Sequence, residues 1–200
     1  DETTSEAYKN YQKLVRKASD SGSIYLAKNN NMMLRYESVK NHCKDMNIIL
    51  LIRKPLDHAN SLLKQHQRFC AMQKEDPFVR EYMDWLGHHE FGLNQKEFQF
   101  NGQESAGSNK DSIDFWVSVW VNYYSAIRQY LSDDQITLIR YEDFLQDPSK
   151  VFQSLKTDLN LPLKERSFEK FTPKTSELPT PENHEKVDLA NRIYEEITSS

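Results

Sequence analysis

The residues best suited to chemistry follow a short apolar run that ends at Arg53. The chain turns at Pro55, and the pattern after it predicts a helix that begins near Leu56 or Asp57. A helix N-terminus offers free backbone N–H groups and a positive dipole end, and an arginine guanidinium binds phosphate through paired donors. Ser61 lies about one turn into this helix and could donate its hydroxyl to the same anion. The segment predicts an anion site, most simply for phosphate; the alternative is an Arg53–Asp57 ion pair beside a solvated Ser61.

These residues require a scaffold of strands and helices. Aliphatic or β-branched runs predict strands at 24–27, 47–53 and 135–141. Residues 48–52 are all apolar, which predicts a strand covered by helices on both faces. Helical patterns lie between the runs, so we expect an α/β fold, a three-layer sandwich with a parallel sheet flanked by helices. Ligands bind at the carboxyl ends of the strands in such sheets, which is where Arg53 lies.

The helices are marked by apolar spacing and by capping residues. Helical spacing predicts helices near 7–18, 32–43, 57–70, 113–131 and 185–197. Asp-Pro pairs at 76–77 and 147–148 predict further helix starts, and Gly87 and Asn160 predict helix ends. The aromatic face of 113–131 is expected to be core. Two segments, 88–110 and 171–183, are predicted to be irregular.

Composition limits the class of protein. Of 200 residues, 38% are hydrophobic, which is enough for a core without disulfide or metal support. The net charge of −4 argues against a nucleic-acid binder. No apolar run approaches the roughly 20 residues of a membrane span. Cys43 and Cys70 are expected to be free thiols, which favours a cytoplasmic protein, or one in the Golgi lumen if an anchor lies upstream.

Two segments carry a family resemblance. The strand followed by Arg-x-Pro-x-Asp-x-x-x-Ser at 47–61 resembles the 3′-phosphate-binding segment of sulfotransferases that use 3′-phosphoadenosine 5′-phosphosulfate (PAPS). The strand, Arg-Tyr-Glu-Asp and Asp-Pro at 136–148, followed by Leu-Asn-Leu-Pro at 159–162, resembles a second family segment in which Asn160 replaces the usual glycine. A weaker likeness at 25–31 places Lys28 at a family lysine. Together the matches cover about 24–162.

The resemblance implies a P-loop NTPase-like sulfotransferase fold and the transfer of a sulfuryl group from PAPS to a hydroxyl or amine of a carbohydrate or small molecule. It implies no metal, and adenosine 3′,5′-bisphosphate as the product. Arg53 and Ser61 would bind the 3′-phosphate. Tyr141 would help to hold the adenosine end, or else is a core tyrosine. Lys28 would lie near the transferred group, or else is a solvated loop lysine.

The departures from the family pattern concern catalysis. The family's Gly-rich phosphosulfate loop is absent from this sequence, and we expect it upstream, so that the fold is incomplete at the N-terminus. Asn30 occupies the position of the histidine that serves as the base in cytosolic members of the family. The base is then either a carboxylate near the phosphosulfate loop, as in other branches of the family, or a histidine of this sequence, for which His58 is the candidate. His88, His89 and Glu90 are expected to have a surface role or to contact the acceptor, rather than to bind a metal.

We expect one sulfotransferase-like domain over 1–200, with a helical and loop insert at 69–110 on the acceptor side. The aromatic residues of this insert either line an acceptor pocket or bury one another. Glu142 and Asp143 are expected to be structural hydrogen-bond acceptors. The alternative functions are a non-catalytic sulfotransferase-like binding or scaffold protein and a nucleotide kinase-like phosphoryl transferase. The oligomeric state does not follow from the sequence.

Overall fold

The computed structural model describes residues 2–17, 24–44, 46–162, 168 and 177–199. The chain divides into two compact units, Asp1–Met46 and Asn47–Ser200. Part of the predicted irregular segment, 171–176, lies outside the described residues, and 177–183 is irregular as expected. None of the described helices is both long and apolar enough to cross a bilayer.

The first unit holds helices and no strand in its described residues. It contains α1 (Glu2–Lys17), the 3₁₀ turn η1 (Met32–Arg35) and α2 (Tyr36–His42). The prediction of a strand at 24–27 is wrong, because this run is irregular and pairs with no strand among the described residues. Its apolar side chains gain no burial either, since Ile24 is 53% and Leu26 is 87% exposed.

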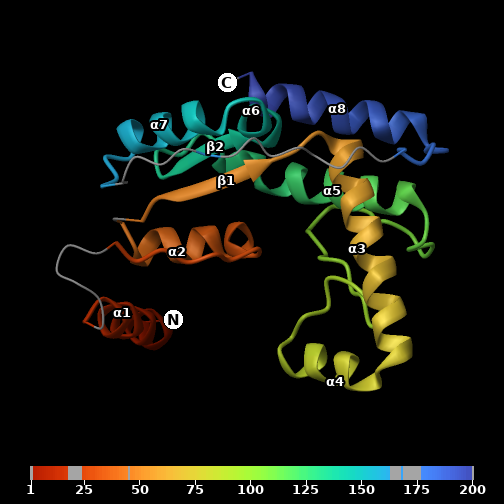
Figure 1. Cartoon of the computed structure of the whole chain (residues 1–200), viewed down its shortest axis with the longest axis horizontal. Helices are drawn as coiled ribbons and strands as arrows, with labels where there is room; N and C mark the ends of the chain where they lie inside the picture. Colours follow the sequence, from red (N-terminus) through yellow and green to blue (C-terminus); the bar gives the residue numbers. More distant parts are fainter. Residues whose placement is uncertain (1, 18–23, 45, 163–167, 169–176, 200) are drawn as a thin grey trace. The chain divides into compact units, whose positions relative to one another are not determined.

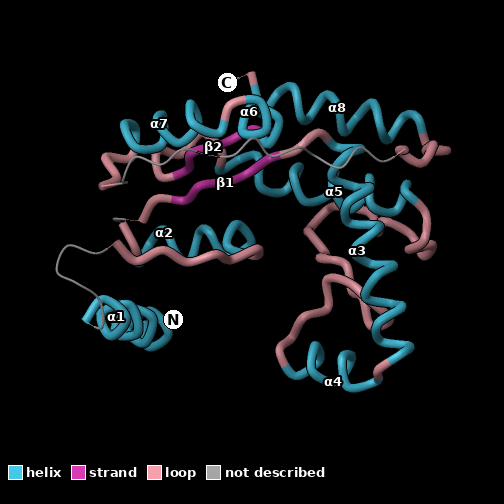
Figure 2. The backbone as a smooth tube through the Cα atoms, in the orientation of Figure 1, coloured by secondary structure: helices cyan, strands magenta, loops and turns pink. Residues whose placement is uncertain are grey.

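The second unit is built on a parallel pair of strands, β1 (Ile48–Ile52) and β2 (Ile136–Arg140). Ile48 pairs with Ile136, and Ile52 pairs with Arg140. Figure 2 shows the two strands lying side by side. The unit therefore has the α/β character and the parallel pairing that the sequence predicted. Its helices are α3 (Pro55–Glu75), α4 (Pro77–Trp85), α5 (Ile113–Ile127), the 3₁₀ turn η2 (Arg128–Tyr130), α6 (Tyr141–Gln146), α7 (Pro148–Asp158) and α8 (His184–Thr198).

The two faces of β1 differ in burial. Ile48 and Ile52 are buried at 8% and 0% exposure, whereas Ile49 and Leu51 are 41% and 49% exposed. A strand sends alternate side chains to opposite faces, so one face of β1 meets the core and the other is open. The uniform apolar run predicted helices on both faces of the strand, and this prediction is wrong for β1.

The core gathers on α5, as its aromatic face predicted. Trp116, Trp120, Tyr124 and Ile127 are all 3% exposed or less. Helix α5 packs against both α3, which precedes it in the sequence, and α8, which follows it. Figure 1 shows α3 leading away from the carboxyl end of β1. The core thus fixes the direction in which α3 leaves the sheet.

Capping residues set the helix boundaries where the sequence predicted them. Asp76 accepts a hydrogen bond from the backbone N–H of Phe78 and caps α4, and Asp147 accepts one from Lys150 and caps α7. Asn160 has φ of 48°, the left-handed conformation that ends a helix. Residues 88–110 form no helix or strand, also as expected.

Candidate anion-binding site at the strand ends

The candidate site lies where the two paired strands end. Because Ile52 pairs with Arg140, the next residue on each strand, Arg53 and Tyr141, lies at the same edge of the sheet. The guanidinium carbon of Arg53 is 5.0 Å from the centre of the Tyr141 ring, a cation–π contact. The structure thereby brings together two of the three residues predicted to bind the cofactor.

Ser61 is the third. Arg53 Nη1 donates a hydrogen bond of 2.7 Å to Ser61 Oγ, so helix α3 carries the hydroxyl back to the strand end. Arg53 Nη2 also lies 3.8 Å from Asp57 Oδ1, and both side chains are partly exposed. An exposed pair at this distance contributes little stability. Both interpretations of the sequence therefore describe real contacts, and the guanidinium retains donors for an external anion.

The N-terminus of α3 is open beside this guanidinium. Lys54 is the N-cap residue, makes no side-chain cap, and is followed by Pro55 at the first helical position. A helix start without a side-chain cap leaves first-turn N–H groups available to an anion. The turn itself is held from behind, because the Lys54 N–H donates to Glu142 Oε1 at 2.9 Å.

Glu142 acts as a structural acceptor, the role expected for it. Its second oxygen accepts a hydrogen bond of 2.8 Å from the Tyr194 hydroxyl. Partial burial alone would raise the pKa of Glu142, but the hydrogen bonds from Lys54 and Tyr194 outweigh it and lower the pKa. Burial, followed by the contact with Glu142, raises the pKa of Tyr194 to about 12. Glu142 is therefore ionised and Tyr194 protonated at neutral pH.

His58 lies in the first turn of α3. Its Nδ1 atom is buried and has no hydrogen-bond partner among the described residues. Burial, followed by the charge of Arg53, lowers the pKa of His58 to about 4, against a smaller opposing effect of Glu142. The imidazole is neutral at physiological pH and a weak base.

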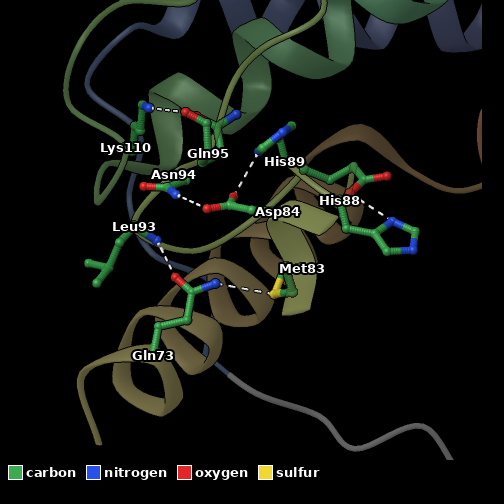
Figure 3. A network of polar contacts seen from close by, with 10 residues as sticks. Gln73, Met83, Asp84, His88, His89, Leu93, Asn94, Gln95 and Lys110 are labelled. Carbon is green, nitrogen blue, oxygen red and sulfur yellow. Dashed lines mark hydrogen bonds and ion pairs between the residues drawn. The ribbon is translucent and has the colours of Figure 1, made fainter. Parts of the chain in front are cut away.

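The remaining predicted residues are Lys28 and the adjacent histidines. Lys28 belongs to the first unit and is exposed in its irregular segment. His88 contacts Glu90 and His89 contacts Asp84, each at 3.4 Å, so the adjacent histidines take different partners (Figure 3). In the described ranges no three His, Cys, Asp or Glu side chains gather as a metal site would require.

Sequence reasoning missed Tyr194. It lies on α8, 52 positions from the carboxylate that it contacts. No local spacing links the two residues, so no pattern in the sequence could have identified the pair. The role of Glu142 was easier to predict than that of Tyr194, because Glu142 lies two residues after the end of β2.

Comparison with known families agrees with this geometry. A family model described as the sulfotransferase domain matches residues 7–184, which is most of the chain. The chain therefore belongs to the sulfotransferase domain family, a family whose activity is sulfuryl transfer. No curated protein and no solved structure gives a significant match.

Proposed function

We propose that the protein transfers a sulfuryl group from PAPS to a hydroxyl or amine of a carbohydrate or small-molecule acceptor. Membership of the sulfotransferase domain family supports sulfuryl transfer in general. The observation that carries the choice of PAPS is the grouping of Arg53, Ser61 and Tyr141 at the ends of two paired strands.

The residues present fit the 3′-phosphate end of PAPS. Arg53 would bind phosphate oxygens through donors that Ser61 does not occupy, and the Ser61 hydroxyl would turn to the same anion. The N–H groups at the uncapped start of α3 would add neutral donors and a favourable dipole. Tyr141 would support the guanidinium and offer its ring to the adenosine end.

PAPS supplies the sulfuryl group and a bisphosphate leaving group when bound. By its likeness to the family lysine, we assign to Lys28 the stabilisation of charge that develops on the leaving oxygen, since a cation there would lower the energy of such a transition state. We assign to His58 the proton of the attacking hydroxyl or amine, because its imidazole is neutral at physiological pH. Its low pKa limits it to a weak base, which makes orientation of the acceptor its main contribution.

The proposal includes a P-loop-like, three-layer sulfotransferase domain over 1–200, with 69–110 as an acceptor-side insert. The parallel pair β1–β2 and the position of α3 directly after β1 support it.

Calorimetric titration with adenosine 3′,5′-bisphosphate tests the cofactor half of the proposal. The 200-residue chain should bind it, and AMP, which lacks the 3′-phosphate, should bind much more weakly. Arg53→Ala removes charge-assisted hydrogen bonds worth roughly 1.5–3 kcal/mol and should weaken binding about 10- to 100-fold. Arg53→Lys keeps the charge without the paired donors and should give an intermediate loss.

The matched control is Arg68→Ala, which removes an exposed arginine from the same helix. It should leave the dissociation constant unchanged. Equal affinity for AMP and the bisphosphate, or equal losses from Arg53→Ala and Arg68→Ala, would remove the basis for the proposed site. A chain that binds neither nucleotide would support the non-catalytic alternative.

A further inference from the structure

Helix α4 presents a group of aromatic side chains to solvent. Phe78, Tyr82 and Trp85 are 55%, 51% and 72% exposed. Their spacing of four and then three residues places them on one face of the helix. The centre of the Phe78 ring lies 6.0 Å from the centre of the Tyr82 ring and 6.0 Å from that of Trp85. Large apolar side chains that are grouped at the surface, rather than scattered over it, mark an interaction site.

The opposite face of α4 anchors the helix. Met83 is 8% exposed, and its sulfur accepts a hydrogen bond of 3.1 Å from Gln73 Nε2 on α3 (Figure 3). Asp84 Oδ2 accepts a hydrogen bond of 2.7 Å from Asn94 Nδ2 in the loop that follows (Figure 3). A partner that binds the three rings therefore meets a helix that is already held in place, and it does not bear the cost of ordering it.

The aromatic group lies far from the strand-end site. Helix α3 begins beside Arg53 and has 21 residues. At 1.5 Å per residue it is about 30 Å long. Figure 1 shows α4 beside the end of α3 that is remote from β1. A molecule that binds to these rings is therefore separate from a nucleotide bound at Arg53, and the proposed function does not account for them.

Glu81 gives this surface its charge. It comes three residues after Phe78 and four before Trp85, so it shares their face of the helix. Its side chain is exposed, and no hydrogen bond or ion pair holds it within the described part of the chain. The one basic residue of α4, Arg80, is two positions from Phe78 and points to another side. We call Phe78, Glu81, Tyr82 and Trp85 together the Trp85 surface.

The chemistry of the Trp85 surface selects among possible occupants. A lipid bilayer would cover the rings but would take the Glu81 carboxylate out of water without a partner. A second copy of the same surface would bring two carboxylates into one interface. A guanidinium suits both parts, because its plane stacks on aromatic rings and its paired donors match a carboxylate. A lysine ammonium would pair with the carboxylate but has no plane to stack.

We propose that the Trp85 surface docks an arginine-bearing segment of a partner protein. The guanidinium stacks on Trp85 and donates hydrogen bonds to the Glu81 carboxylate. Phe78 and Tyr82 cover the aliphatic part of the same side chain. Tryptophan, tyrosine and arginine are the residues that most often dominate the affinity of protein interfaces, and this arrangement would supply all three.

Three blocked decapeptides serve as probes, in each of which glycine alternates with a second residue. The second residue is arginine, lysine, or citrulline, which keeps the planar group of arginine and lacks its charge. Trp85 fluorescence follows binding, because the other two tryptophans, Trp116 and Trp120, are 2% and 1% exposed. Calorimetry in low-salt buffer measures the dissociation constants of all variants, including those without Trp85.

We expect the arginine peptide to change Trp85 fluorescence, the lysine peptide to bind more weakly and the citrulline peptide not to bind. Glu81→Gln should weaken binding of the arginine peptide about tenfold, and Trp85→Ala about three- to tenfold. The matched controls are Glu195→Gln, an exposed carboxylate on α8, and Phe98→Ala, a ring 41% exposed outside α4. Both should keep the original affinity. All four variants alter partly or fully exposed side chains and should keep the unfolding midpoint.

Failure of the arginine peptide to bind would overturn the proposal. Equal binding of the citrulline peptide, or equal losses from Glu81→Gln and Glu195→Gln, would also overturn it. The other occupants are tested with phosphatidylcholine vesicles and by analytical ultracentrifugation of the chain alone. Binding to vesicles, or self-association, that Trp85→Ala abolishes would assign the surface to a membrane or to a second copy, and either result would replace the proposal.

Discussion

The backbone N–H of Lys54 donates a hydrogen bond of 2.9 Å to Glu142 Oε1, and the two residues are 88 positions apart in the sequence. Lys54 precedes α3, and Glu142 lies in the first turn of α6. The bond ties the turn after β1 to the turn after β2, and Tyr194 secures the same carboxylate from α8. Arg53 is therefore positioned by a carboxylate that need not touch the ligand.

Replacing Glu142 with glutamine should loosen this turn. The substitution removes the charge. The new side-chain NH₂ group then faces one of the two donors, the Lys54 N–H or the Tyr194 hydroxyl. Hydrogen bonds to charged groups contribute about 1.5–3 kcal/mol, so we expect a loss of roughly 1–3 kcal/mol in the free energy of unfolding, measured in urea. The control Asp143→Asn alters an exposed carboxylate 3.6 Å from Arg140 and should cost under about 0.5 kcal/mol. Similar losses for the two variants would contradict the role of Glu142.

Tyr141 should matter for its ring and not for its hydroxyl. Tyr141→Phe keeps the ring under the Arg53 guanidinium and should leave bisphosphate affinity nearly unchanged. Tyr141→Leu removes the cation–π contact, worth about 0.5–1 kcal/mol at such a site, and should weaken binding about two- to fivefold. Calorimetry on the two variants measures the difference. A larger loss from the phenylalanine variant would show that the hydroxyl binds the ligand.

His58 should make stability depend on pH. Its folded-state pKa of about 4 is below the unfolded value of about 6.5, so the unfolded chain takes up the proton first as the pH falls. The contribution of His58 is complete above about pH 6.5 and is lost as the pH falls towards its folded pKa, by at most about 3 kcal/mol.

His58→Gln removes this titration. The free energy of unfolding of the variant, measured in urea at a series of pH values, should fall less steeply between about pH 6.5 and 4 than that of the original chain. The exposed Gln67 of the same helix, replaced with alanine, is the control, and its pH profile should run parallel to that of the original chain. Parallel pH profiles for the original chain and His58→Gln would show that the imidazole titrates normally.

Asp114 joins the start of α5 to the chain that enters α8. Its two carboxylate oxygens accept hydrogen bonds from the N–H groups of Glu182 at 3.1 Å and Asn183 at 3.0 Å. Asp114→Ala leaves both donors without this partner and should lower the free energy of unfolding by about 2–4 kcal/mol. Asp188→Ala, which removes an exposed carboxylate from α8, should have little effect. Thermal unfolding of the two variants measures the difference. A wild-type midpoint for Asp114→Ala would show that the two N–H groups find other acceptors.

The parts of the fold that the sequence predicted well are those set by neighbours in the chain. The strands β1 and β2 follow from aliphatic runs, and the starts of α4 and α7 follow from Asp76 and Asp147, each before a proline. The Arg53–Ser61 contact was also predictable, because a helix that starts after the turn returns the hydroxyl to the strand end.

The features of the fold that the sequence did not predict depend on segments that are distant in the chain. Residues 24–27 have a strand composition, but a strand exists only with a partner, and no strand in the described part of the chain pairs with them. The open face of β1 at Ile49 and Leu51 depends on which helices reach the sheet, not on the run itself. The contact of Tyr194 with Glu142 arises only when helices far apart in sequence meet.

The pairing of Ile52 with Arg140 makes the strand-end site sensitive to residue count. Substitutions inside β2 that preserve the strand leave Tyr141 beside Arg53. Deleting one residue from β2 would instead place Glu142 beside Arg53. Inserting one residue would place Arg140 there. The deletion would set a carboxylate against the guanidinium and fill an anion site with the protein's own charge, so we expect β2 to accept altered side chains far more readily than an altered length.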